Sequence, residues 1–208
     1  MDRFTTKEIA LFKRLNTPAK IQDYLETLAP NFEEDGETCM SPRRVIETQK
    51  AHCMEGALFA AAVLAYHGQK AFVLDLKVSD HSIDDDHVVA LFREEGCWGA
   101  ISKTNHAVLR YREPIYRTIR ELALSYFHEY FTDTGKKTLT SFSKPFNLAQ
   151  FDDRNWMTSE KDLWYIPRAL DKSPHENITT PAVRKKFRRA DPIEIKAGKI
   201  VKTRRSKH

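Results

Sequence analysis

Residues 52–68 constrain the fold more than any other stretch, because they read HCMEGALFAAAVLAYHG. Five alanines leave helix faces small enough for neighbouring strands to approach closely, and larger apolar residues occupy the other sides. Gly68 follows the last apolar residues, and a glycine at that position commonly ends a helix in the left-handed conformation. The stretch therefore predicts a buried helix that begins at Cys53 and leads into a strand.

The thiol of Cys53 lies on the first turn of this predicted helix. There the free backbone N–H groups and the positive end of the helix dipole favour the thiolate, which is the form that attacks carbonyl carbon. Cys53 is thus a candidate nucleophile. The alternative interpretation is that Cys53 is only a small packing residue in an alanine-rich helix.

The chain is long enough for one sizeable core, since it has 208 residues. Its charge is uneven: residues 183–208 hold eleven Lys or Arg against two acidic residues, and the remainder is mildly acidic. We therefore expect a single domain over residues 1–182 and a basic extension over 183–208 that is solvated and partly ordered at most. The alternative is that this extension contacts nucleic acid or an acidic protein.

The N-terminus has no apolar signal segment, and no apolar run is long enough to cross a bilayer, so we expect a cytoplasmic protein without membrane association. The three cysteines, Cys39, Cys53 and Cys97, lack CxxC spacing, which argues against a disulfide framework and a structural zinc site. Residues 84–87 read DDDH, but consecutive side chains cannot all converge on one ion. No metal site is predicted.

Periodicity and capping signals predict an α+β chain with helices first and, after the buried helix, a sheet that is at least partly antiparallel. The expected helices cover residues 5–15, 18–28, 43–49, 53–67 and 113–130, and the expected strands cover 71–78, 87–92 and 97–101. If the hairpin between the last two strands reverses at Glu95 and Gly96, Ser102 lies opposite Val89 and shares a face of the sheet with His87. His87 is then the candidate base for the thiol.

A helix led by cysteine is followed by a strand, by a second strand that opens with His87, and by a third that contains Trp98. This order resembles the core of the transglutaminase-like superfamily of cysteine enzymes. The matching segments are residues 41–46, 52–57, 68–71, 87–92 and 97–102, within a region of residues 18–105. The resemblance implies a Cys-led helix packed on an antiparallel sheet, a Cys-His-Asp triad, and acyl transfer without a cofactor.

By position in that family, Cys53 would be the nucleophile and His87 its base. Family members place Asp where this chain has Ser102, whose hydroxyl can accept a hydrogen bond from an imidazole but has no charge. Asn105 is the other candidate for the orienting group, because an amide oxygen holds the imidazole in papain-like enzymes. The Cys53 backbone N–H and the side chain of Gln49 would bind the oxyanion.

The sequence thus favours a thiol enzyme that hydrolyses an amide or peptide bond through a thioester on Cys53. The absence of Asp at position 102 leaves a second hypothesis, an inactive transglutaminase-like scaffold that binds a peptide or protein in the same groove. A third and weaker hypothesis is a nucleic-acid-associated protein that acts through its basic extension.

Overall fold

The computed structural model describes residues 4–34, 36–78 and 80–203 as a mixed α+β fold built on an antiparallel sheet. In the described residues this sheet has seven strands in the order β6-β5-β4-β3-β7-β9, with β8 also paired to β3. The strands are β3 (Phe72–Val78), β4 (His87–Glu94), β5 (Cys97–Ile101), β6 (Arg112–Tyr116), β7 (Leu139–Ser143), β8 (Phe146–Asn147) and β9 (His175–Asn177). A small parallel pair consists of β1 (Ala29–Pro30) and β2 (Lys50–Ala51).

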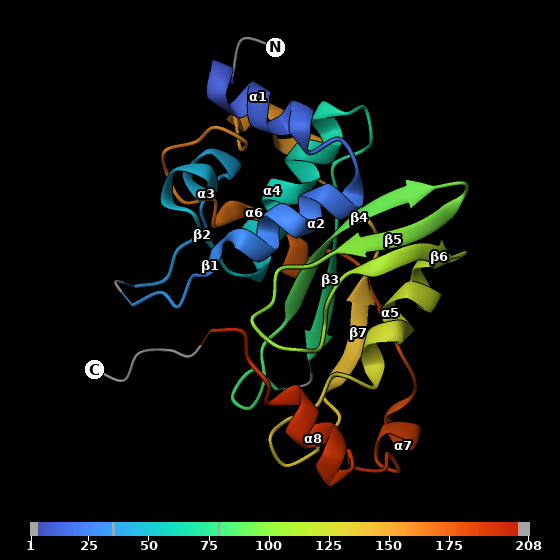
Figure 1. The fold of residues 1–208 in the computed structure, drawn as a ribbon. Coiled ribbons are helices and arrows are strands. Elements are labelled where there is room, and N and C mark those ends of the chain that lie inside the picture. The colour runs from blue at the N-terminus through green and yellow to red at the C-terminus, as the bar shows by residue number, and fades with distance from the viewer. Residues whose placement is uncertain (1–3, 35, 79, 204–208) are drawn as a thin grey trace.

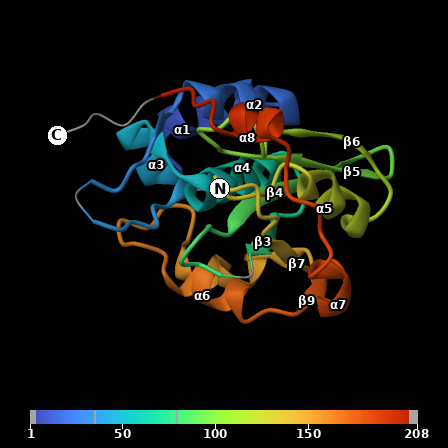
Figure 2. The same cartoon turned by 90° about the horizontal axis from the view of Figure 1, so that it is seen from below.

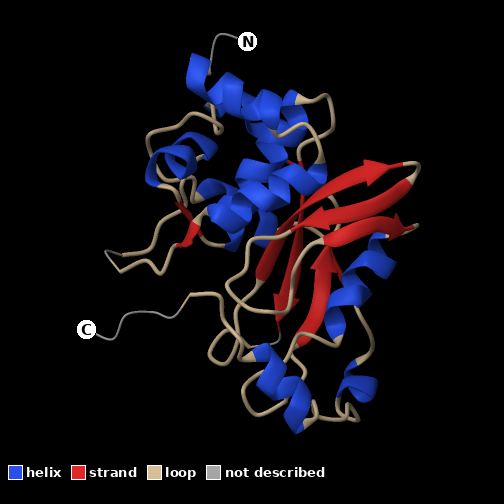
Figure 3. Ribbon diagram, viewed as in Figure 1, coloured by secondary structure: helices blue, strands red, loops and turns tan. Residues whose placement is uncertain are grey.

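Helices gather on both faces of this sheet and at its lower end (Figures 1 and 3). They are α1 (Thr6–Arg14), α2 (Pro18–Thr27), α3 (Pro42–Thr48), α4 (Cys53–Tyr66), α5 (Ile119–Phe127), α6 (Tyr165–Asp171), α7 (Pro181–Arg184) and α8 (Pro192–Gly198), with a 3₁₀ helix at Leu148–Arg154. Among the described residues, no helix is both long and apolar enough to span a bilayer.

The helix α4 is the centre of the core, as its apolar composition predicts. Residues 54–64 are all buried, and α4 packs on α2, α3, β3 and β4. Seen from below, α4 lies between α2 and α6 (Figure 2). Because side chains alternate across a strand, Val73 and Ala90 face the α4 cluster, whereas Leu74 and Leu91 face a second cluster formed with α5.

The β4–β5 hairpin has the register that the turn predicts. Ala90 pairs with Ile101 and Leu91 with Ala100. Glu95 and Gly96 both have positive φ angles of 45° and 81°, which suits the right-handed twist of a two-residue hairpin. The register places Ser102 directly after β5, on the face of the sheet to which His87 belongs.

The predicted helix over residues 113–130 is wrong in its first part. Residues 112–116 form the edge strand β6, and α5 begins only after the N-cap Thr118, whose hydroxyl accepts a hydrogen bond from the Glu121 N–H. An edge strand tolerates Pro114, which has no N–H to donate. Ile115 fits the helical spacing but is 69% exposed, so the periodicity that predicted one long helix was partly accidental.

Residues 183–203 make specific contacts with the rest of the chain, although most of their side chains are exposed, as the sequence predicted. Val201 forms a β-bridge with His106, and the Ala107 N–H donates to the Ile200 carbonyl at 2.9 Å. Some of the basic side chains form ion pairs, such as Lys202 with Glu26 at 3.1 Å. These contacts are made with residues distant in sequence, so the number of charges within the segment does not predict them.

Gly56 permits the closest approach between α4 and the chain that follows β5. A Cβ atom at position 56 would lie 2.4 Å from the Cβ of Lys103. Lys103 cannot easily withdraw, because its buried ammonium group donates to the carbonyls of Leu25 and Leu28 at 2.9 and 2.6 Å. The glycine is therefore required by packing.

We predict that Gly56→Ala destabilises the protein. Alanine gains about 1 kcal/mol over glycine in a helix interior, but overpacking typically costs about 1–3 kcal/mol. We expect a net loss of about 1 kcal/mol in the free energy of unfolding, since this clash involves a Cβ atom rather than the end of a flexible side chain. Urea unfolding would measure it, and an unchanged or higher midpoint would contradict the prediction.

Candidate active site

Cys53 is the first residue of α4 and lies half-buried between two histidines, His52 and His87. Burial of the sulfur would raise the pKa of Cys53, but hydrogen bonds from the side chains of His52 and His87, and their charges, lower it to about 5. The imidazoles thus outweigh the desolvation of the anion. The structure brings together the nucleophile and the base that the sequence predicted.

The orientation of the His87 ring follows from its hydrogen bonds. Its Nε2 lies 2.8 Å from Oγ of Ser102, and Ser102 Oγ donates to the carbonyl of Leu109 at 2.5 Å. A hydroxyl has one proton, so Ser102 must accept from His87 Nε2–H. The opposite ring nitrogen, Nδ1, is then unprotonated in the neutral ring and free to take the thiol proton.

The sequence left Ser102 and Asn105 as alternatives for the group that orients the His87 ring. In the structure that group is Ser102. Ser102 is fully buried, and its backbone is fixed by two hydrogen bonds of 2.9 Å with the side chain of Gln22. Asn105 lines the hollow near Cys53, but its amide binds the backbone of Thr203 through both its nitrogen and its oxygen. The structure therefore assigns the contact with His87 to Ser102.

Gln49 does not lie where an oxyanion donor is needed. It is the exposed C-cap of α3, and its amide nitrogen donates to Tyr24 Oη at 2.9 Å and to the Ile46 carbonyl at 2.7 Å. The left-handed backbone at Gln49, with φ of 55°, turns its side chain back over α3, which the linear sequence did not reveal. The backbone N–H of Cys53 remains suitable, because the first residue of a helix has no intrahelical acceptor.

Glu55 organises the start of α4, and sequence analysis did not identify it. This fully buried carboxylate accepts hydrogen bonds from Thr38 Oγ1 at 2.7 Å, the Met40 N–H at 2.9 Å, and Asn31 Nδ2 and the His52 N–H at 3.1 Å each. Glu55 thereby ties Asn31, Thr38 and Met40 to the helix that carries Cys53. The spacing of a cap residue with Glu three positions later is the signal that could have found it.

His52 is both the N-cap of α4 and the second imidazole at the sulfur. Its Nδ1 accepts from the Met54 N–H at 3.2 Å, and Nε2 lies 3.0 Å from the Thr38 carbonyl and 3.5 Å from Glu55 Oε1. Burial would lower the pKa of His52, but Cys53, then Glu55, raise it to about 9. The contact with the Met54 N–H uses Nδ1 as an acceptor and so belongs to the neutral ring, whereas a protonated His52 would give up that contact and add positive potential beside the sulfur.

The loop after β5 carries Leu109, which lies in the left-handed region with φ of 61°. Such a conformation costs free energy for a residue with a Cβ atom and persists only where neighbours impose it. Here Glu129 accepts from the Leu109 N–H at 2.7 Å, while Ser102 donates to its carbonyl.

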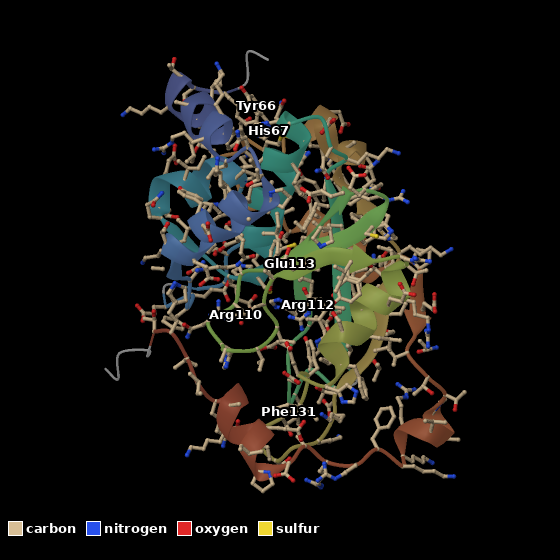
Figure 4. All side chains as sticks on the ribbon, turned by 45° about the vertical axis from the view of Figure 1, so that its right-hand side comes forward. Tyr66, His67, Arg110, Arg112, Glu113 and Phe131 are labelled. Atoms are coloured by element: carbon tan, nitrogen blue, oxygen red, sulfur yellow. The ribbon has the colours of Figure 1, made fainter. Side chains whose placement is uncertain are left out.

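Arg110 and Arg112 follow Leu109 in the chain (Figure 4). Arg110 pairs with Glu26 of α2 at 2.9 Å, and Arg112, the first residue of β6, pairs with Glu129 at 2.7 Å. Since Glu129 also accepts from the Leu109 N–H, these pairs help to fix the chain beside the carbonyl that orients Ser102.

The sulfur opens into a hollow of about 370 Å³ whose walls come from three parts of the chain. Phe32 belongs to the loop before α3, Asp84 to Asp86 precede β4, and Leu109 and Tyr130 close the far side. In the part of the chain that the structure describes, no group of three or more His, Cys, Asp or Glu side chains could hold a metal ion.

Comparison of the chain with models of known families and with curated proteins found no match.

We predict that iodoacetamide at pH 6 alkylates Cys53 before the other cysteines. With a pKa of about 5, Cys53 is mostly thiolate at that pH, and its rate falls only as the pH drops through 5. Burial, with the nearby Glu55, raises the pKa of Cys39 to about 12. Mass mapping would assign the adducts, and His87→Ala should move the midpoint of the rate profile upward.

This prediction fails if Cys53 reacts no faster than Cys39 and Cys97. The half-buried Cys97 on β5 is the matched comparison for access.

We predict that Glu55→Gln lowers the free energy of unfolding by about 2–3 kcal/mol, because neutral amide groups replace a buried charged acceptor of four hydrogen bonds. Glu47→Gln, at an exposed position of α3, is the control and should change stability by less than about 0.5 kcal/mol. Guanidinium unfolding would measure both. Equal effects would show that the carboxylate does not hold the start of α4.

Proposed function

We propose that this chain is a cysteine-dependent acyl-transfer enzyme of transglutaminase-like type that hydrolyses an amide or peptide bond. The observation that carries the proposal is the hydrogen-bond chain from Cys53 through His87 to Ser102 and the Leu109 carbonyl. It fixes the tautomer in which His87 can receive a proton from the thiol. A nucleophile, a base and an orienting group in that sequence of contacts are the parts that thiol acyl transfer requires.

In the proposed reaction, the Cys53 thiolate attacks the carbonyl carbon and forms a tetrahedral adduct, while the Cys53 backbone N–H donates to the oxyanion. The adduct collapses, the bond to the leaving group breaks, and the His87 imidazolium gives its proton to that group. A thioester on Cys53 remains. Water then attacks the thioester as His87 takes its proton, which releases the acid and restores the thiolate and the imidazolium.

Ser102 changes the electrostatics relative to an aspartate at the same position. Its hydroxyl orients the His87 ring but supplies no negative charge to stabilise the imidazolium. A protonated His52 would be a second donor to the sulfur, in which case the thiolate would not depend on His87 alone. An aspartate would also meet the Leu109 carbonyl, to which it has no proton to donate, whereas the serine hydroxyl satisfies both neighbours.

A scaffold that binds a peptide or protein without turning it over is the second candidate function. The neutral Ser102 favours it, because an orienting group without charge leaves the imidazolium less stable and the base weaker. The low pKa of Cys53 favours the enzyme instead, since a packing cysteine needs no thiolate.

We predict that the protein hydrolyses p-nitrophenyl acetate through an acetyl adduct on Cys53. Cys53→Ala should abolish the adduct and the associated burst, and Cys97→Ala should leave both unchanged. Ser102→Ala should lower the rate about tenfold, the equivalent of one ordinary hydrogen bond. Mass spectrometry and p-nitrophenolate release would measure these effects.

The proposal is overturned if wild-type protein forms no adduct, or if Cys53→Ala hydrolyses the ester at the wild-type rate. A protein that forms no adduct and still binds peptide ligands after Cys53→Ala would be the scaffold.

A further inference from the structure

A cavity of about 620 Å³ adjoins the hollow that contains Cys53. The two share four lining residues, Asp84, His106, Leu109 and Tyr130, and therefore lie side by side. Leu109 marks the junction. Its carbonyl accepts from Ser102 of the hydrogen-bond chain, while its side chain lines both spaces.

Most of the exposed surface of the cavity wall is apolar. Six of its fifteen residues, from separate parts of the chain, carry large apolar side chains: Ile83, Val108, Leu109, Tyr130, Phe131 and Ile195. The volume is within the range of about 300–1,000 Å³ that is usual for small-molecule sites. A space of this size and composition suits an aromatic or branched aliphatic side chain.

The acidic groups in the wall are already occupied by protein donors. Asp84 accepts from Thr138 Oγ1 at 2.5 Å, Glu129 pairs with Arg112, and Asp133 pairs with Lys199 at 3.6 Å. An apolar ligand would therefore bury few unpaired charges, which is the main penalty against such binding.

The outer wall of the cavity is α8, from the extension that the sequence treated as solvated. Ile195, Gly198 and Lys199 line it, and α8 is fixed in place by the His106 ring, whose Nδ1 lies 3.0 Å from the Gly198 carbonyl. A Cβ atom at Gly198 would lie 3.1 Å from the Phe131 ring, so α8 packs closely on this wall.

We propose that this cavity is a specificity subsite that binds a large apolar side chain of the acyl donor, next to the carbonyl attacked by Cys53. The inference rests on the proposed function and adds to it the class of acyl group. It gives the C-terminal extension a role in substrate selection through α8. Phe131 and the loop that contains Arg110 lie on the same side of the molecule as α8 (Figure 4).

Two activated esters test the proposal with the full chain: the p-nitrophenyl esters of N-acetyl-phenylalanine and N-acetyl-alanine. We expect kcat/KM to be about 10–100-fold higher for the phenylalanine ester, the range that burial of a large apolar group provides. A ratio near one, with Cys53 acylated by both esters, overturns the subsite and leaves the proposed function standing. Acylation by neither ester overturns both.

Ile195→Ala with Ile193→Ala as its matched control places the effect in the cavity. Both residues are on α8, but Ile195 lines the cavity, whereas Ile193 is 74% exposed. We expect Ile195→Ala to lower the phenylalanine to alanine ratio about three- to tenfold through the phenylalanine ester alone. Ile193→Ala should leave the ratio unchanged. Equal ratios in the two variants would overturn the assignment of α8 as the wall.

Discussion

Glu55 accepts four hydrogen bonds at the start of α4, and the position of the sulfur depends on them. A buried carboxylate is stable only when its lone pairs are used, so Asn31, Thr38, Met40 and the His52 backbone are fixed relative to the helix. His52 consequently lies beside Cys53, where its ring helps to lower the pKa of the thiol. One carboxylate thus couples the folding of a loop to the chemistry of a thiol.

The second imidazole comes from the sheet, and its orientation depends on a strained loop. The single proton of the Ser102 hydroxyl goes to the Leu109 carbonyl, so in the contact between Ser102 and His87 the imidazole is the donor. The left-handed backbone of Leu109 is maintained by Glu129, and Arg112 pairs with that carboxylate. The strained backbone at Leu109 therefore helps to hold His87 in one tautomer.

The C-terminal extension shows that the distribution of charge along the sequence does not by itself predict which segments contact the rest of the protein. Its excess of basic residues suggested a solvated segment, and most of its side chains are exposed, but Ile200 and Lys202, which follow α8, form backbone hydrogen bonds with Ala107 and Asn105 in the loop after β5. The same loop reaches Leu109, so the extension and the hydrogen-bond chain of the candidate site are joined by a few residues. A change in the position of α8 would therefore alter the shape of the cavity beside Cys53.

The sequence by itself determined the buried helix, its start at Cys53, the strand that opens with His87, and the hairpin register that brings Ser102 to the same face, because these follow from local periodicity and turn chemistry. Tertiary structure decided the rest. The burial of Glu55 among Asn31, Thr38 and Met40, the contact of Gln49 with Tyr24 and the bond between His106 and the end of α8 depend on partners distant in the chain, and a single sequence carries no record of such contacts. The helix predicted over residues 113–130 was wrong in its first part for the same reason. Residues 112–116 pair with β5, and this pairing outweighed their helical spacing.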